Sequence, residues 1–190
     1  MKNLLMVIFT KLLQSIKSKV LLSLLFVISA AFLSAFLDAL TVTAVLITVM
    51  VGFYHVFANS LKNNEITTKE FEQVKSFLVD IMMHGAVGTA LGGVCTLVGE
   101  PQNLLIATIA GWEFVEFFLR MAPITMPVFV AGIFTCFMIE KFAIAGFGNQ
   151  LPPNIREIFN DYSVYREENI TAKDRAELLV ESLVAVFLVI

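Results

Sequence analysis

The chain has 190 residues, of which 58% are hydrophobic and only 15% are charged. A soluble domain has about 45–50% apolar and about 25% charged residues, so this chain has too few charges to cover a water-facing surface. The net charge of −3 and the lack of a long basic run exclude a nucleic-acid-binding protein that tracks the phosphate backbone. The composition therefore predicts an integral membrane protein.

The first long apolar run covers residues 20–58, and Asp38 is its only charged residue. As one helix it would measure about 58 Å, whereas a bilayer core is about 30 Å thick. The run must therefore fold back near Asp38, as two spans or as a re-entrant helical hairpin. No Gly, Pro or Asn marks a water-exposed turn there, so we expect a turn buried inside the protein. Residues 1–19 before it are expected to form a cytoplasmic amphipathic segment and not a cleaved signal peptide.

Residues 59–75 are polar and are expected to form a cytoplasmic loop. Near its end, Thr67 and Glu70 have the spacing of a capping box, which predicts that a helix starts near Thr67. Residues 76–110 are apolar and would form a helix about 52 Å long, again too long for one straight crossing. Glycines and Pro101 interrupt this segment, so we expect a broken transmembrane helix.

The rest of the chain is divided into three further segments. We expect a transmembrane helix over residues 121–139, a cytoplasmic amphipathic loop over 140–175 and the start of another transmembrane helix over 176–190. Lys and Arg concentrate before residue 20, in 59–80 and in 140–175, whereas residues 111–120 hold Arg120 alone. This alternation puts the three basic segments on the cytoplasmic side. It is the same for two full spans and for a re-entrant hairpin.

Asp38 is the first candidate for a functional residue. An acid near the bilayer centre costs about 2.5–3.5 kcal/mol on insertion scales, so such residues point to function. Thr41 follows within one turn and could add a hydroxyl to an oxygen-rich ion site. The alternatives are a surface loop for Asp38 and, for Thr41, a hydrogen bond back to its own helix.

A second candidate region has the composition of an unwound helix. Glycines free the backbone carbonyls and proline removes a donor, and irregular backbone within a membrane must be buried or line a cavity. The backbone residues are Gly92, Gly93, Gly99 and Pro101, and the side-chain oxygens come from Thr96, Glu100 and Asn103. Hard cations such as Na⁺ prefer oxygen ligands of this kind. An extracytoplasmic loop between two helices is the alternative.

Asp80 and His84 lie one helical turn apart in the same region. A proton relay is conceivable for this pair. Because Asp80 falls near the expected cytoplasmic end, we favour a solvated or interfacial position for both side chains.

The two candidate regions together carry a family resemblance. The strings FLDALTV, over residues 36–42, and GGVCTLVGEPQNL, over residues 92–104, closely resemble NhaB-type sodium/proton antiporters of the ion transporter superfamily. Related carriers have an Asn at the hairpin tip, where this chain has Ala39, and a second Pro in the helix break, where it has Gln102. Both differences favour the NhaB type over arsenite or carboxylate carriers.

The resemblance implies an ion-transporter repeat with a re-entrant helical hairpin and a discontinuous transmembrane helix. Proteins of this kind are longer and consist of two inverted repeats whose hairpins and broken helices meet at the substrate site. This sequence resembles the first repeat, so the second repeat would be its partner. The implied activity is secondary active Na⁺/H⁺ antiport by alternating access in a bacterial inner membrane. The resemblance implies no cofactor besides the transported ions and allows a homodimer.

On this interpretation Na⁺ and H⁺ compete for one carboxylate, because protonation removes the charge that holds the cation. Asp38 is the candidate, Thr41, Thr96, Glu100 and Asn103 are expected to border it, and Glu100 is the rival for the titrating role. The alternatives are an anion carrier for arsenite or a carboxylate and an accessory membrane subunit without transport. An intramembrane enzyme is disfavoured, since the sequence has no Gly-x-Ser-x-Gly or His-Glu-x-x-His motif and no second acid in the run around Asp38.

Overall fold

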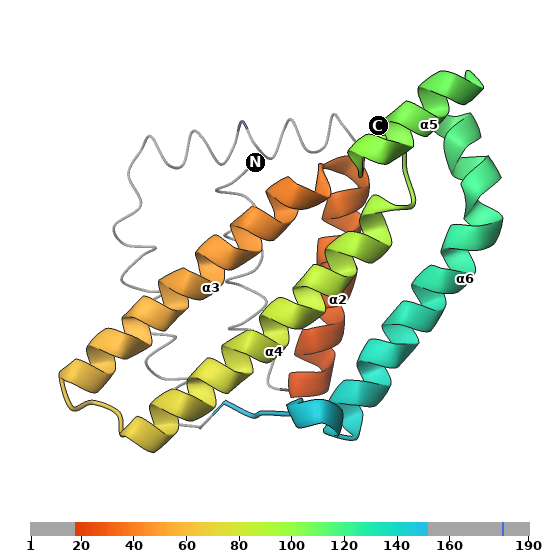
Figure 1. The fold of residues 1–190 in the computed structure, drawn as a ribbon. Helices are drawn as coiled ribbons and strands as arrows, with labels where there is room; N and C mark the ends of the chain where they lie inside the picture. Colours follow the sequence, from red (N-terminus) through yellow and green to blue (C-terminus); the bar gives the residue numbers. More distant parts are fainter. Residues whose placement is uncertain (1–17, 152–179, 181–190) are drawn as a thin grey trace.

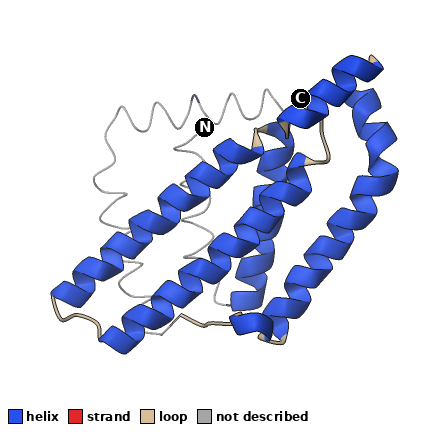
Figure 2. Ribbon diagram, in the orientation of Figure 1, coloured by secondary structure: helices blue, strands red, loops and turns tan. Residues whose placement is uncertain are grey.

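The structure, a computed structural model, describes residues 18–151 and Val180, and the regular structure among them is entirely helical (Figure 2). The elements are α2 (Lys19–Phe36), α3 (Ala39–Lys62), α4 (Thr68–Gly93), α5 (Pro101–Ala110), α6 (Phe114–Lys141) and the 3₁₀ turn η1 (Ile144–Gly146). Helices α2, α3, α4 and α6 are long and apolar enough to cross a membrane. The expected all-α polytopic membrane fold is thereby confirmed. The amphipathic segment 1–19 except its last two residues, most of the loop 140–175 and most of the helix 176–190 lie outside the described residues.

Helices α2 and α3 form an antiparallel hairpin whose tip is Leu37 and Asp38 (Figure 1). The chain reverses where the sequence predicted, because Asp38 caps the first turn of α3. The described residues cover this turn only in part, so its burial inside the whole protein stays a prediction. Leu37 and Asp38 are only partly buried, and Leu40 is 73% exposed. The outer side of the tip has no described element packed over it.

Helix α4 starts directly after Thr67, as the sequence predicted. The Thr67 hydroxyl accepts from the Glu70 backbone N–H, and the Glu70 carboxylate accepts from the Thr67 N–H at 2.8 Å. The connection to α3 is shorter than the predicted loop over 59–75, because α3 continues to Lys62 and the cap starts α4 at Thr68. Residues 63–67 alone separate the two helices.

Helices α2 and α4 approach so closely that two positions on α4 have no room for a side chain. A Cβ on Gly88 would lie 2.3 Å from the carbonyl oxygen of Val27, and one on Gly92 would lie 1.9 Å from that of Ala31. Glycine is therefore required at both positions for this contact. Toward the other end of the helices, α2, α3 and α4 share an apolar core, whose most buried members include Phe26, Leu46, Phe57 and Ile81.

Helix α4 ends at Gly93 and α5 begins at Pro101, so the predicted interruption of the 76–110 helix is observed. Helix α5 then extends beyond the hairpin tip, and α6 runs back along the bundle (Figure 1). A residue in the left-handed region, Gly111 with φ +70°, ends α5.

Helix α6 is longer than the predicted span 121–139. Residues 114–120 are polar enough that the sequence placed them before the span, but they form the start of α6. Glu116 and Arg120 are one turn apart there and form an ion pair of 2.8 Å on the helix surface. At its other end α6 includes Glu140, which the sequence pattern placed in a loop. The start of the predicted loop 140–175 is therefore helical.

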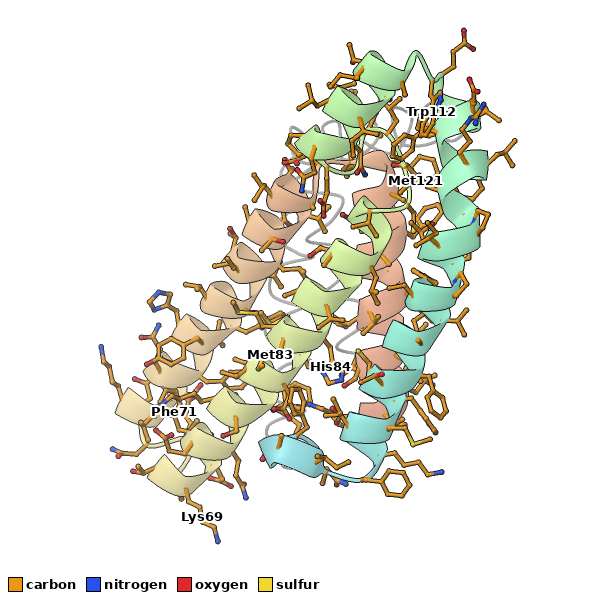
Figure 3. All side chains as sticks on the ribbon, turned by 45° about the vertical axis from the view of Figure 1, so that its right-hand side comes forward. Lys69, Phe71, Met83, His84, Trp112 and Met121 are labelled. Atoms are coloured by element: carbon orange, nitrogen blue, oxygen red, sulfur yellow. The ribbon has the colours of Figure 1, made fainter. Side chains whose placement is uncertain are left out.

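The two ends of the bundle differ in charge. Lys62, Lys69 and Lys141 lie at the α3–α4 connection and at the end of α6, whereas the α5–α6 connection contains Trp112 and no lysine or arginine. Lys69 and Trp112 mark these opposite ends in Figure 3. The lysine-rich end is the one that the positive-inside pattern predicts to be cytoplasmic.

Candidate functional site

Four helix ends converge where the hairpin tip meets the interrupted helix. They are the C-terminal ends of α2 and α4 and the N-terminal ends of α3 and α5. The Ala39 N–H donates to the Gly99 carbonyl at 3.0 Å, and the Thr96 hydroxyl donates to the Ala35 carbonyl. The two regions singled out by the sequence are thus in direct contact.

Asp38 uses only one of its two carboxylate oxygens in this contact region. Its Oδ2 accepts from the Thr41 N–H at 3.1 Å and faces the Thr41 hydroxyl at 3.4 Å. Its Oδ1 is buried and has no hydrogen-bond partner among the described residues. A buried acceptor without a partner costs about 1–3 kcal/mol, and more when it is charged. The oxygen is therefore suited to bind a proton or a cation.

Asn103 holds the interrupted helix together. Its side-chain amide donates to the carbonyl of Gly93 at 3.0 Å and to that of Thr96 at 2.8 Å, and the side chain is buried. These bonds satisfy carbonyls that the break removes from the helix. The observed contribution of Asn103 comes from its side-chain nitrogen, whereas the sequence singled the residue out for its oxygen.

Glu100 is the N-cap residue of α5, and its side chain makes no capping bond. It lies instead against α4, where a Cβ on Gly93 would be 3.2 Å from its Oε1. It also accepts from the amide of Gln102. Glu100 is partly buried and follows Gly99, the residue that bonds the hairpin tip.

The glycines and the proline of the break have separate roles. A Cβ on Gly99 would lie 2.4 Å from the carbonyl oxygen of Gly93. Only glycine therefore allows the backbone at position 99 to pack against the end of α4. Pro101 begins α5, where its missing N–H would have no helical partner in any case.

Sequence reasoning missed two hydroxyls beside the site. Ser34 is fully buried and donates to the Thr89 carbonyl at 2.8 Å, and the Thr89 hydroxyl lies 3.2 Å from that of Thr43. A single Ser or Thr in an apolar helix usually bonds its own helix, so the sequence held no signal for these contacts between helices.

The predicted site residues therefore fall into two groups. Asp38 and Thr41 lie on the tip, and Thr96, Glu100 and Asn103 lie on the break, with the Ala39–Gly99 backbone bond and the Thr96–Ala35 bond joining the two groups. The C-terminal ends of α2 and α4 carry partial negative charge that favours a cation, whereas the N-terminal ends of α3 and α5 favour the carboxylates of Asp38 and Glu100, their N-cap residues. The arrangement can hold one small cation or one proton at a carboxylate. No cluster of three or more His, Cys, Asp or Glu side chains suited to a metal is present in residues 18–151.

The solvated position that the sequence suggested for Asp80 and His84 is wrong, whereas their depth relative to the membrane interface stays a prediction. Their exposed fractions are 5% and 2%, and they pack at the end of the bundle opposite to Asp38. The cause is tertiary: α2 and α6 bring Lys19 and Glu140 against them. His84 is labelled in Figure 3.

The whole chain, residues 1–190, matches the family model of the bacterial Na⁺/H⁺ antiporter B, NhaB. The chain belongs to the NhaB family. Proteins described as Na⁺/H⁺ antiporter NhaB are 49% identical in Shewanella halifaxensis, 50% in Vibrio cholerae and 51% in Pectobacterium atrosepticum, each over 100% of this chain. The chain spans 38–39% of the length of these relatives. No solved structure matches it.

These relatives are described as Na⁺/H⁺ antiporters, which are transporters. The expected family is therefore confirmed, and the four apolar helices make the chain a multi-pass membrane protein. The hairpin tip and the helix break of this NhaB chain contain the two motifs, over residues 36–42 and 92–104.

Proposed function

We propose that the protein containing this chain exchanges Na⁺ for H⁺ across a bacterial inner membrane, and that this chain supplies the first of its two ion-binding repeats. The observation that carries the proposal is the buried, unpartnered Oδ1 of Asp38 where four helix ends meet. A carboxylate oxygen in such a place is stabilised by either ion, and the two ions exclude each other.

In the proposed mechanism, Asp38 is the group for which Na⁺ and H⁺ compete. Thr41 fixes its orientation through Oδ2, which leaves Oδ1 to the transported ion. Thr96, Glu100 and Asn103 border the site from the break, and carbonyl oxygens at the ends of α2 and α4 add further cation ligands. If the site changes sides only when loaded, proton entry drives Na⁺ extrusion by alternating access.

We further propose that α2 and α3 form a re-entrant hairpin, with its tip inside the bilayer. Helix α5 has ten residues and extends about 15 Å beyond the break. Four of its side chains are exposed and apolar: Leu104, Leu105, Ile106 and Ile109. Since the tip bonds the break at Gly99, Asp38 would lie well below the polar end at Trp112.

Accessibility to an impermeant maleimide separates the two topologies. A cysteine at Ala39 should stay unlabelled from either side in a re-entrant hairpin, whereas one at Glu113 should label from the outside. Cys95 and Cys136 are buried and can be replaced by alanine as the background. Equal labelling at both introduced cysteines would show that the tip is a surface turn.

The central test is Asp38→Asn in the full-length protein, with Na⁺-dependent dissipation of ΔpH measured in membrane vesicles. Asparagine is also a good N-cap, so the fold should persist while exchange falls at least about tenfold, the effect of losing about 1.4 kcal/mol or more of ion binding. Glu72→Gln, which changes an exposed acid on α4, is the matched control. Near-normal exchange by Asp38→Asn would remove Asp38 from the mechanism.

The same experiment separates the alternatives. An anion carrier needs donors at its site, and the unpartnered group on Asp38 is an acceptor, so the structure favours a cation. An accessory subunit predicts that Asp38→Asn alters assembly without changing exchange. Glu100→Gln measured beside Asp38→Asn decides which carboxylate titrates. The partners expected are the lipid bilayer, the two ions, the second repeat and a second copy in a homodimer, with no cofactor.

A further inference from the structure

A group of buried ionisable side chains lies at the lysine-rich end of the bundle, remote from Asp38. It consists of Lys19 on α2, Asp80 and His84 on α4, and Glu140 on α6, which we call the charge cluster. Helix α2 has 18 residues, so about 27 Å of helix separates Lys19 from the hairpin tip. The charge cluster is therefore a separate site.

Lys19 is the central cation of the charge cluster. Its Nζ lies 3.3 Å from Asp80 Oδ2 and 3.7 Å from Glu140 Oε1. The exposed fractions of the three side chains are 8%, 7% and 0%. One lysine thus faces two carboxylates, and these three groups carry a net charge of −1.

Asp80 is well supplied with donors, whereas Glu140 is not. The Asp80 Oδ2 accepts from the backbone N–H of Asn149 at 3.2 Å and from its side-chain amide at 3.1 Å. The two carboxylate oxygens of Glu140 are buried and make no hydrogen bond of good geometry, and the neighbouring Ser23 hydroxyl is the uncharged donor beside them. Glu140 is therefore less well supplied with hydrogen-bond donors than Asp80.

His84 faces oxygen acceptors with both ring nitrogens. Its Nδ1 lies 2.8 Å from the Asp80 carbonyl, and its Nε2 lies 3.5 Å from the Cys136 carbonyl and 3.7 Å from Glu140 Oε2. A neutral imidazole has one N–H and would turn a lone pair toward one of these acceptors, whereas an imidazolium donates from both nitrogens. The ring of Phe147 covers His84 edge-on at 5.1 Å.

We propose that the charge cluster is a second proton-binding site, in which His84 holds the proton as an imidazolium against Glu140. With the proton bound, two cations balance two carboxylates. Without it, a net charge of −1 stays buried, which is costly in a low dielectric. A proton fits and a metal ion does not, because the Lys19 ammonium already occupies the position between the carboxylates.

The proton would join parts of the chain that are distant in sequence. The charge cluster connects α2, α4 and α6, and Asn149 connects the segment after η1 to Asp80. Proton release would weaken the attachment of the Glu140 end of α6, while the tip and the break would keep their hydrogen bonds. The proposal does not rest on antiport activity, since proton binding is measured directly.

The test is ¹⁵N NMR of ring nitrogens in the full-length, histidine-labelled protein, with the His84 signal assigned by its loss in His84→Gln. At pH 7.5 an ordinary exposed histidine is only about 10% protonated. We expect the imidazolium signal of His84 at this pH to exceed that of an exposed histidine, and Glu140→Gln to lower it several-fold. Glu72→Gln is the acid control, and His55→Gln identifies the signal of His55, the other histidine of this chain, which is exposed.

A neutral His84 ring at pH 7.5, or an imidazolium fraction unchanged by Glu140→Gln, would overturn the proposal. Thermal unfolding in detergent provides a second measurement. The folded site would bind one proton that the unfolded chain releases, so the folding equilibrium constant should fall by up to tenfold per pH unit above about pH 7. Glu140→Gln should remove that slope, whereas a merely structural cluster would leave the same slope in both proteins.

Discussion

The two ends of the α2–α4 pair bury polar groups in opposite ways. At the Asp38 end the carboxylate accepts from the backbone N–H and the hydroxyl of Thr41 and keeps one oxygen without a donor. Around Lys19 the partners are charged side chains, which pair with one another from three helices. The first end is arranged to receive an ion from outside, and the second end largely supplies its own counterions.

This difference predicts different responses to substitution. Charge pairs buried in a low dielectric respond strongly to the loss of one partner and to pH. Contacts between backbones respond to steric bulk and to lost donors, with little dependence on pH. Variants at the two ends should therefore separate cleanly in a pH series.

The largest effect is expected for Lys19→Met, which keeps the length of the side chain and removes its charge. Asp80 and Glu140 would then lose their shared cation, and breaking a buried pair costs about 3–5 kcal/mol. The free energy of unfolding in detergent measures the loss. The loss should shrink at low pH, as protons replace the missing cation. A loss that is equal at pH 5 and pH 8 would show that the charges there are of little consequence.

Gly92→Ala tests the close backbone contact between α2 and α4. The added Cβ would meet the Ala31 carbonyl oxygen at 1.9 Å, so the helices must separate at a cost of about 1–3 kcal/mol. Gly52→Ala is the control, because nothing lies within 4 Å of its Cβ. That variant should gain about 0.5–1 kcal/mol from helix propensity. Thermal unfolding at two pH values should show both shifts to be independent of pH.

Asn103→Ala removes both amide donors from the break. The carbonyls of Gly93 and Thr96 would lose a partner, at about 1 kcal/mol for each hydrogen bond. Hydrogen exchange of the backbone amides at the start of α5 should then accelerate, while exchange near Asp80 stays unchanged. Faster exchange at both ends would contradict the independence of the two regions.

The smallest effect is expected for Glu116→Gln, at the α5–α6 end. The Glu116–Arg120 pair is exposed, with side chains 42% and 55% accessible, and such helical pairs contribute about 0.3–0.5 kcal/mol. The free energy of unfolding should fall by no more than this amount, and by less at high salt. A larger loss would indicate that this end of α6 is buried in the full-length protein.

Local patterns predicted the fold well. The Thr67–Glu70 box placed the start of α4, and the run length placed the reversal at Asp38, because both depend on neighbouring residues alone. The glycines and Pro101 located the helix break for the same reason. The membrane topology and the roles of Asp38, Thr41, Thr96, Glu100 and Asn103 in transport stay predictions.

The charge cluster was not predictable in this way. Lys19 and Asp80 are 61 residues apart in sequence, and their contact exists only once α2 packs on α4. Glu140 follows the last apolar residue of its run, so the pattern assigned it to a solvated loop. Asp80 and His84 alone have the spacing of many exposed helical pairs. These two side chains are buried because α2 and α6 pack over them.

The glycines at positions 88 and 92 have a mechanical consequence. Where two helices touch through backbone atoms, no layer of flexible side chains can absorb a sliding or rocking motion between them. Helices α2 and α4 should therefore move as one rigid lever, with the hairpin tip at one end and Lys19 at the other. The non-helical residues between Gly93 and Pro101 connect this lever to α5, and the two bonds of Asn103 set how firmly α5 follows its motion.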